Sequence, residues 1–322
     1  MSLSSDNFTA LIHLRDQARK WKNIAFLLII TTFLLVFRML FGSNDVNSNI
    51  EAGDYIANVS IEGIILDDDY RSEILTKIAN QKNIKAVIVN IDSPGGGIVG
   101  SEVLYENLRT IAMQKPIVVM MGSLAASGGY MASIASDYII ARNGTLTGSI
   151  GVIMQSSEFT DLANKLGIKF LTYKSSPLKG VPSPFEKSNP QVNQVINDSI
   201  QDSYQFFSSL VKERRGAKLD KNNLSHILDG RIFTGRQALK SGLVDEIGGK
   251  NEALKYLNTV HKVDTEKFPV KNVELQKPES TLFAKLIDKE TMSKVIENIT
   301  GFSIKSDQLM SIWNLGISTS TK

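Results

Sequence analysis

The sequence contains no cysteine and only three histidines among its 322 residues. Without cysteine, the chain has no disulfide bond, no thiolate metal site and no cysteine nucleophile. The histidines are His13, His226 and His261. Any reaction that depends on a histidine base therefore has few candidates.

A strong charge of either sign is also absent. The 36 lysines and arginines nearly balance the 33 aspartates and glutamates, and aromatic residues make up only 7% of the chain. A nucleic-acid-binding face normally clusters its basic side chains, whereas this sequence has no long basic run. We therefore expect no nucleic-acid partner.

One long hydrophobic run lies close to the N-terminus, NIAFLLIITTFLLVFRMLF at residues 23–41. A helix of about 18 of these residues is about 27 Å long, which suffices to cross a thin hydrocarbon layer. A buried core helix and a cleavable signal peptide are the alternatives. The run is long for a signal peptide, however, and no small-x-small cleavage site follows it. We predict an uncleaved signal anchor at 24–41 that holds the chain in a lipid bilayer.

The charges that flank this run predict its orientation, because basic residues precede it and acidic residues follow it. Lysine and arginine stay on the cytoplasmic side, so residues 1–23 should lie in the cytoplasm and the rest of the chain outside it. We predict a polar linker at 42–54, a folded domain at 55–262 and an amphipathic tail at 263–322. By default the tail docks on the domain, and a neighbour or the membrane surface is the alternative.

The region after the linker alternates between strand and helix patterns. Apolar runs predict strands at 55–65, 84–91, 116–122, 137–142 and 168–175. Helical spacing predicts helices at 70–81, 98–114, 157–167 and 191–214. Such alternation is typical of an α/β fold with parallel strand pairing.

Two finer features are predicted within this region. Residues 229–249 have the pattern of a strand, a short helix and a second strand. The helix at 98–114 is expected to bury one apolar side. The side chains on this side are Ile98, Val99, Val103, Leu104, Leu108 and Ile111.

Two glycine-rich turns, SPGGG at 93–97 and ASGG at 126–129, each follow a predicted strand and open a helix. Helix N-termini carry free N–H groups, and glycine lets a substrate oxygen approach them closely. Phosphate binding is one use of such turns, but neither has the G-K-[ST] or G-x-G-x-x-G pattern of nucleotide sites. The other use is an oxyanion hole, to which two neighbouring strands contribute one donor each.

Ser127, inside the second turn, is a candidate nucleophile. The alternative is that its small neighbours only allow a helix to pack closely on the sheet. A nucleophilic serine needs a base, but His13 precedes the hydrophobic run, His261 lies late, and His226 has the spacing of a packing residue. A lysine is the remaining base, because burial away from water favours the neutral amine. Lys179 is the candidate, since it lies between two prolines in SPLKGVPSPFEKSNP. A solvated loop lysine is the alternative.

Four motifs carry a resemblance to a known family. They are DSPGG, ASGGYMAS, TGSIGVI and FTGRQALKSGLVDEIGG. In this order, over residues 55 to about 260, they resemble the signal peptide peptidase A family in its short, single-copy form. The resemblance implies a fold of the Clp protease and crotonase type, with repeated β-β-α units. It also implies a serine–lysine protease that clears remnant signal peptides at the bacterial inner membrane.

The resemblance also assigns roles to individual residues. It implies that Ser127 is the nucleophile, that Lys179 is the general base and that Ser149 orients the lysine. The N–H groups of Gly96 and Gly128 would form the oxyanion hole. Should Lys179 not serve, the other candidates for the base are Lys174 and Lys187. No metal or cofactor is expected.

A single-copy chain is expected, by similarity, to form a ring in which neighbours share the serine and the lysine. Its expected partners are peptide substrates, the lipid bilayer and further copies of itself. Three alternatives remain open. They are a related protease of the SohB or stomatin-operon type, a crotonase-like acyl-CoA enzyme, and an inactive membrane-anchored scaffold.

Overall fold

A computed structural model of the chain describes residues 21–22, 25–26, 28–33 and 53–276. The chain divides into two units, one formed by Met1–Glu51 with Pro278–Lys322 and the other by Ala52–Lys277. Among the described residues, no helix is long and apolar enough to cross a membrane. Most of the predicted signal anchor, and all of the amphipathic pattern in the predicted tail, lies outside the described residues.

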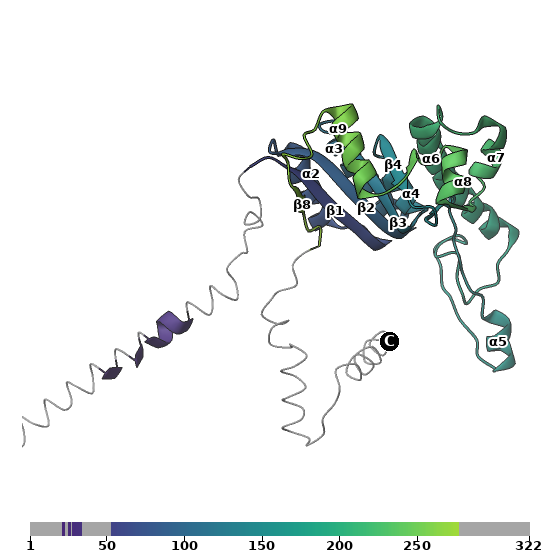
Figure 1. Cartoon of the computed structure of the whole chain (residues 1–322). Helices are drawn as coiled ribbons and strands as arrows, with labels where there is room; N and C mark the ends of the chain where they lie inside the picture. Colours follow the sequence, from purple (N-terminus) through teal and green to yellow (C-terminus); the bar gives the residue numbers. More distant parts are fainter. Residues whose placement is uncertain (1–20, 23–24, 27, 34–52, 277–322) are drawn as a thin grey trace, which may run out of the picture. The chain divides into compact units, whose positions relative to one another are not determined.

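The second unit is built around one mixed sheet with helices on both of its faces (Figure 1). The strands are β1 Tyr55–Ile65, β2 Ile84–Gly96, β3 Ile117–Ala126, β4 Tyr138–Ala141, β5 Leu146–Gly148, β6 Ile232–Thr234, β7 Glu246–Ile247 and β8 Val270–Asn272. The α-helices are α2 Asp69–Asn80, α3 Ile98–Ala112, α4 Gly128–Ser133, α5 Thr160–Lys165, α6 Pro190–Arg215, α7 Leu224–Ile227, α8 Gly235–Ser241 and α9 Lys250–His261.

The sheet is largely parallel, as the alternating pattern predicts. Its strand order is β6-β5-β3-β2-β1-β8, with β4 paired to β3 and β7 paired to β4. Every described strand pair is parallel except β5 with β6. Because β2 and β3 are parallel neighbours, their carboxyl ends lie at the same edge of the sheet.

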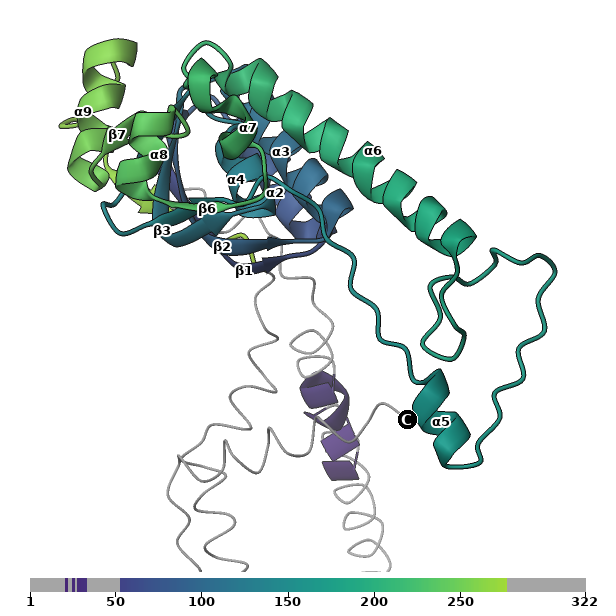
Figure 2. The same ribbon diagram turned by 90° about the vertical axis from the view of Figure 1, so that its right-hand side faces the viewer.

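The larger part of the core lies on one face of the sheet, where α2, α3, α4 and α6 cover the strands (Figure 2). A smaller core on the other face joins the strands to α9, which contributes Ala253 and Leu257. Successive side chains of a strand point to opposite faces. A strand that is covered on both faces therefore has a continuously apolar sequence. Residues 84–91 show this run, as predicted.

Three predicted details are wrong. In α3, Ile98 and Val99 are 42% and 59% exposed rather than buried. Residues 168–175 contain no strand. The folded unit also continues past residue 262, because β8 pairs with β1.

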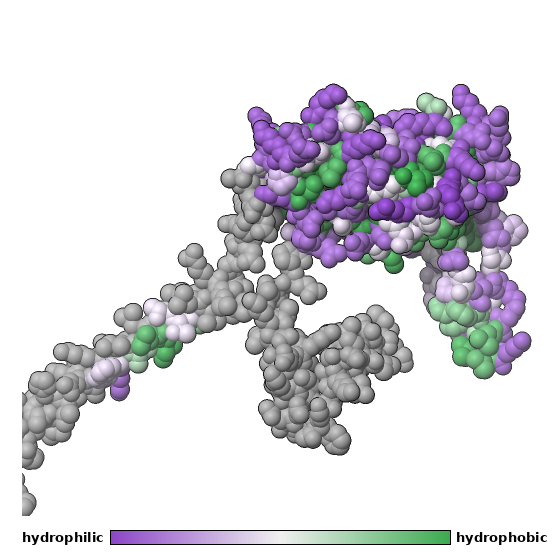
Figure 3. All heavy atoms as spheres, viewed as in Figure 1, coloured by the Kyte–Doolittle hydropathy of each residue, from purple (hydrophilic) through white to green (hydrophobic). Residues whose placement is uncertain are grey.

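Residues 152–189, which we call the arm, project from the body of the unit and carry α5 near their far end (Figure 2). Apolar side chains gather on the arm around α5 (Figure 3). The exposed apolar side chains of the arm are Ile153, Met154, Phe159, Leu162, Leu166, Ile168, Phe170, Leu171, Tyr173 and Phe185. Soluble proteins rarely leave so many neighbouring apolar side chains exposed unless a partner or a membrane covers them.

Candidate active site

Ser127 occupies the turn between β3, which ends at Ala126, and α4, which begins at Gly128. Its backbone angles are φ 53 and ψ −120, a conformation that non-glycine residues rarely adopt. Holding such a residue costs about 1–3 kcal/mol, and strained residues of this kind cluster at functional sites. The Ser127 hydroxyl does not cap α4. The turn therefore presents a strained, half-buried serine whose oxygen is not used by its own helix.

The two glycine-rich turns are in contact, as the sequence predicts for the ends of neighbouring strands. Gly95 has φ +95, and a Cβ built on it would lie 2.6 Å from the Gly128 nitrogen and 3.0 Å from the Ser127 Cβ. Gly96 is equally confined, because its Cβ would lie 1.9 Å from the carbonyl oxygen of Ile65. Only glycine allows this approach at either position.

Gly128 is the first residue of α4, so its N–H has no partner inside the helix. A Cβ on Gly128 would lie 2.1 Å from the Ser101 Oγ. The amide therefore lies between the first glycine turn and α3, directly beside Ser127. This is the environment in which a backbone N–H can serve as a donor to a substrate oxygen.

Ser149 lies beside Ser127 because β3 and β5 pair in register, with Ala126 opposite Gly148. The Ser127 N–H donates to the carbonyl oxygen of Gly148 at 2.9 Å. Ser149 also has a left-handed backbone, with φ 51. The two serines thus directly follow two strand residues that lie opposite each other, and the structure brings them together.

The structure does not bring Lys179 to this pair of serines. Lys179 lies on the arm with an exposed side chain. Within the described part of the chain, no hydrogen bond joins its Nζ to Ser127 or Ser149. Its backbone N–H donates to the carbonyl oxygen of Ser176 at 3.2 Å.

The two other candidate lysines both form ion pairs with carboxylates of the arm. Lys174 pairs with Glu186, and Lys187 lies 2.8 Å from Asp161. The hydrogen bond that Lys187 donates to the Asp161 carboxylate raises the pKa of the Lys187 amine. A carboxylate partner favours the ammonium form, which cannot accept a proton. The contact with Asp161 makes Lys187 a poorer base than a lysine without such a partner.

The histidines of the described region form other contacts. His226 lies 3.7 Å from Asp229 and 2.9 Å from a guanidinium nitrogen of Arg231. His261 contacts the ring of Tyr256, and His13 lies outside the described residues. No described hydrogen bond links His226 or His261 to Ser127.

Sequence reasoning missed three polar residues that surround the turns. Ser93 and Ser101 are fully buried, and the Ser101 hydroxyl donates to the carbonyl oxygen of Gly97. The Asp92 carboxylate accepts the N–H of Leu124 at 3.0 Å, where β2 and β3 shift register. Asp92 and Ser93 stand within the DSPGG motif, but a motif does not say which of its side chains turn inward.

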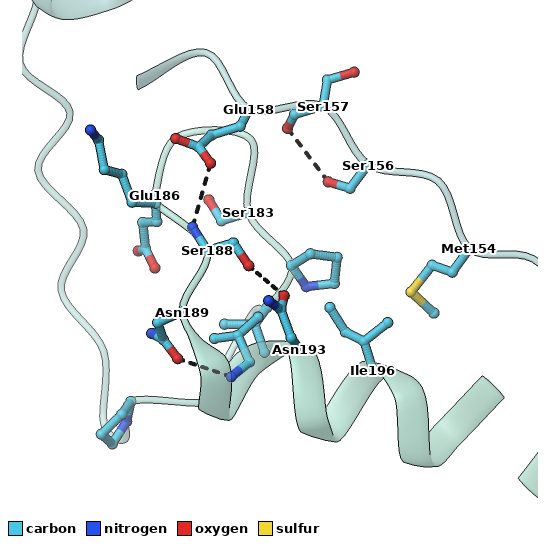
Figure 4. A pocket seen from close by; sticks show the side chains of 15 residues that line it. Met154, Ser156, Ser157, Glu158, Ser183, Glu186, Ser188, Asn189, Asn193 and Ile196 are labelled. Carbon is cyan, nitrogen blue, oxygen red and sulfur yellow. Dashed lines mark hydrogen bonds between the residues drawn. The ribbon is translucent and has the colours of Figure 1, made fainter. Parts of the chain in front are cut away.

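Ser127 lines neither of two cavities in the described part of the unit. One, of about 300 Å³, lies where the two limbs of the arm meet the start of α6 (Figure 4). Its lining includes Pro177 and Val181, which flank Lys179 along the chain. The other, of about 580 Å³, lies over β1 to β3 and includes Glu62 and Asp92. Neither cavity by itself joins the nucleophile to a base.

Residues 109–264 match peptidase family S49. A candidate signal peptide peptidase SppA of Enterococcus faecium is 35% identical over 251 residues, 72% of each chain. A candidate protease of Synechocystis is 34% identical over 224 residues, which cover 69% of this chain and 80% of that protein. Protease 4 of Haemophilus influenzae is 36% identical over 62% of this chain and 34% of its own length.

Among solved structures, a membrane-bound stomatin-specific protease aligns with a TM-score of 0.46 and 17% identity. The alignment covers 71% of this chain and 100% of that one. The three sequence relatives above are named as proteases or peptidases, and this chain is a peptidase as well. The chain belongs to peptidase family S49. The resemblance predicted from the four motifs is confirmed, and the acyl-CoA enzyme is set aside.

Proposed function

We propose that this chain is a membrane-anchored serine endopeptidase that degrades remnant signal peptides and other unfolded or membrane-released peptides. The observation that carries the proposal is the strained Ser127 backbone at the β3–α4 turn, packed against the second glycine turn. This geometry resembles the strand-to-helix turn on which other hydrolases expose a serine. The name of the Enterococcus faecium relative supports the substrate class.

The proposed reaction is acyl transfer through an ester intermediate. The Ser127 Oγ attacks the carbonyl carbon of a peptide bond while its proton passes to the neutral amine of Lys179. The N–H groups of Gly96 and Gly128 hold the oxyanion. The C–N bond then breaks, and the lysine ammonium gives its proton to the leaving amine. Water next attacks the ester, and its proton passes to Lys179. The C–O bond then breaks to release the acid, and the lysine ammonium returns the proton to the Ser127 oxygen, which restores both groups.

The lysine is proposed to come from a neighbouring copy of the chain, which would form a ring with its neighbours. In a single chain Lys179 is exposed and bonded to neither serine, so an intrachain dyad has no support in the described contacts. The exposed apolar side chains of the arm fit docking on a second copy. Such docking would also remove water from the lysine, which favours its neutral form. Ser149, next to Ser127, would then accept or donate a hydrogen bond that orients the amine.

The anchor and its orientation belong to the same proposal. A signal anchor at 24–41 with a cytoplasmic N-terminus would hold the catalytic unit on the extracytoplasmic face of the bacterial inner membrane. Signal-peptide remnants remain in this membrane, so the anchor would keep the enzyme near its substrates. A ring would exclude folded proteins, because only extended chains reach an enclosed site.

A serine-reactive fluorophosphonate probe tests the proposed nucleophile. The full-length chain in detergent should be labelled on Ser127, as mapped by mass spectrometry of proteolytic fragments. Ser123→Ala is the matched control, because Ser123 is an exposed serine of the same strand, and it should leave the labelling unchanged. A folded, oligomeric chain that takes no label on Ser127 would favour the inactive scaffold instead.

The glycine turns allow a second test of the proposed site. Gly95→Ala places a methyl group 2.6 Å from the Gly128 nitrogen at a left-handed φ, and should push the two turns apart. We expect peptide cleavage to fall about 10²-fold, the effect of losing one oxyanion donor. Gly97→Ala is the control, because its Cβ would have no atom within 4 Å. Equal activity of the two variants would mean that the contact between the turns does not serve catalysis.

A further inference from the structure

Ser93 is completely buried where β1, β2 and the first glycine turn meet, with an exposed fraction of 0%. Its hydroxyl donates to the carbonyl oxygen of Gly63 at 2.6 Å. The same oxygen accepts the N–H of Gly95 at 3.0 Å. One hydroxyl, acting as donor and acceptor at once, therefore ties β1 to the first glycine of the turn.

Both groups that Ser93 joins belong to glycines with left-handed backbones. Gly63 has φ +72 at a register shift in β1, and Gly95 has φ +95. Glycine adopts many backbone conformations, so three successive glycines do not set the direction of their own peptide groups. External contacts must therefore hold the turn. One is the ladder with β1, in which Gly95 and Gly96 lie opposite Ile64 and Ile65. A second is the Ser93 hydroxyl, which binds Gly95 directly before the peptide group that carries the Gly96 N–H.

Ser93 also contacts the second turn. In the β2–β3 ladder it pairs with Ala125, two residues before Ser127. A Cβ on Gly129 would lie 2.8 Å from the Ser93 carbonyl oxygen, so α4 packs directly on this residue. Ser93 thus touches both turns whose N–H groups are proposed as donors, while its side chain is too buried to reach a substrate.

We propose that Ser93 is a positioning residue of the oxyanion hole, which its hydroxyl holds in shape through Gly95. The proposal rests on the proposed function. A donor must lie within hydrogen-bond distance of the oxyanion, and a small displacement weakens the transition state more than the bound substrate. Loss of the hydroxyl should therefore lower kcat and leave KM nearly unchanged.

The test compares Ser93→Ala with the wild-type chain, both full length, on a peptide substrate and a peptide boronic acid. The boronate forms a tetrahedral adduct on a nucleophilic serine and places an oxygen in the oxyanion hole. We expect kcat and boronate affinity to fall by about tenfold or more in parallel, with KM within about twofold. Ser136→Ala is the matched control, because Ser136 is 3% exposed and its hydroxyl also binds two backbone groups.

Each outcome of the test has a defined meaning. Equal losses in boronate affinity and substrate binding, or losses no larger than those of Ser136→Ala, would overturn the positioning role alone. A wild-type chain that neither cleaves the peptide nor binds the boronate would overturn the proposed function and this role with it. If Ser93→Ala does not fold, the same measurements are made on Ser93→Cys. The thiol is a weaker donor and acceptor, so the same parallel loss should appear with a smaller size.

Discussion

Cleavage of a synthetic signal peptide by the Ser127→Ala variant is expected to fall at least about 10⁴-fold below that of the wild-type chain. The substitution removes the oxygen that would form the ester intermediate. The oxyanion donors remain, so weak catalysis of direct water attack can persist. Mass spectrometry of the products measures both the rate and the sites of cleavage.

The Ser127→Ala variant should fold as the wild-type chain does. The Ser127 hydroxyl makes no cap bond to α4, and its backbone N–H bond to Gly148 does not depend on the side chain. Thermal unfolding and oligomeric state should therefore be unchanged. Ser123→Ala, prepared and purified in the same way, controls for contaminating proteases. Cleavage by a pure Ser127→Ala chain at the wild-type rate and sites would remove Ser127 from the mechanism.

The centre of the sheet could be predicted from the sequence because its signals are local. Residues 84–91 are almost continuously apolar, and a strand enclosed on both sides requires this. The two glycine turns were predictable for the same kind of reason. Only glycine fits where Gly95 and Gly128 meet. Contacts of this kind therefore appear in the sequence as glycine motifs.

Other features could not be predicted, because periodicity shows which residues are apolar but not what covers them. Ile98 and Val99 have helical spacing, yet they lie in the first turn of α3 and are exposed. Residues 168–175 have the composition of a strand, but no strand lies beside them to accept their hydrogen bonds. The strand β8 is only three residues long, and it forms by pairing with β1, which is far away in the sequence.

The candidate site also contains residues that local sequence patterns indicate and residues whose role depends on distant contacts. Ser127 and Ser149 come together because β3, which the sequence predicts, pairs with β5, a three-residue strand that it does not predict. Ser93 was missed because its contacts are distant in the sequence. Its hydroxyl binds Gly63, thirty positions earlier, and its carbonyl oxygen lies against Gly129 of α4. Lys179 is the opposite case, since its neighbours in the sequence say nothing about where its amine points. If a second copy completes the site, the position of the Lys179 amine relative to a serine is set only in the assembly and not within one chain.

A mixture of Ser127→Ala and Lys179→Ala chains provides the decisive test of a shared site. Each variant alone should be inactive, because every site lacks either the nucleophile or the base. In a ring with head-to-tail contacts, some sites of a mixed assembly combine the intact serine of one chain with the intact lysine of the other. At equal amounts this holds for about one quarter of the sites, so activity should return to about one quarter of the wild-type value.

The control for this experiment replaces Lys179→Ala with a chain that carries both substitutions. Mixed with Ser127→Ala, the double variant forms the same assemblies but provides no nucleophile, so no activity should return. Differently tagged chains and sequential affinity purification show that the assemblies are mixed. Verified mixed assemblies without recovered cleavage would contradict a site shared between copies, and the base would then have to lie in the same chain as Ser127. Recovery would instead explain why the arm leaves its apolar side chains and Lys179 exposed in a single chain.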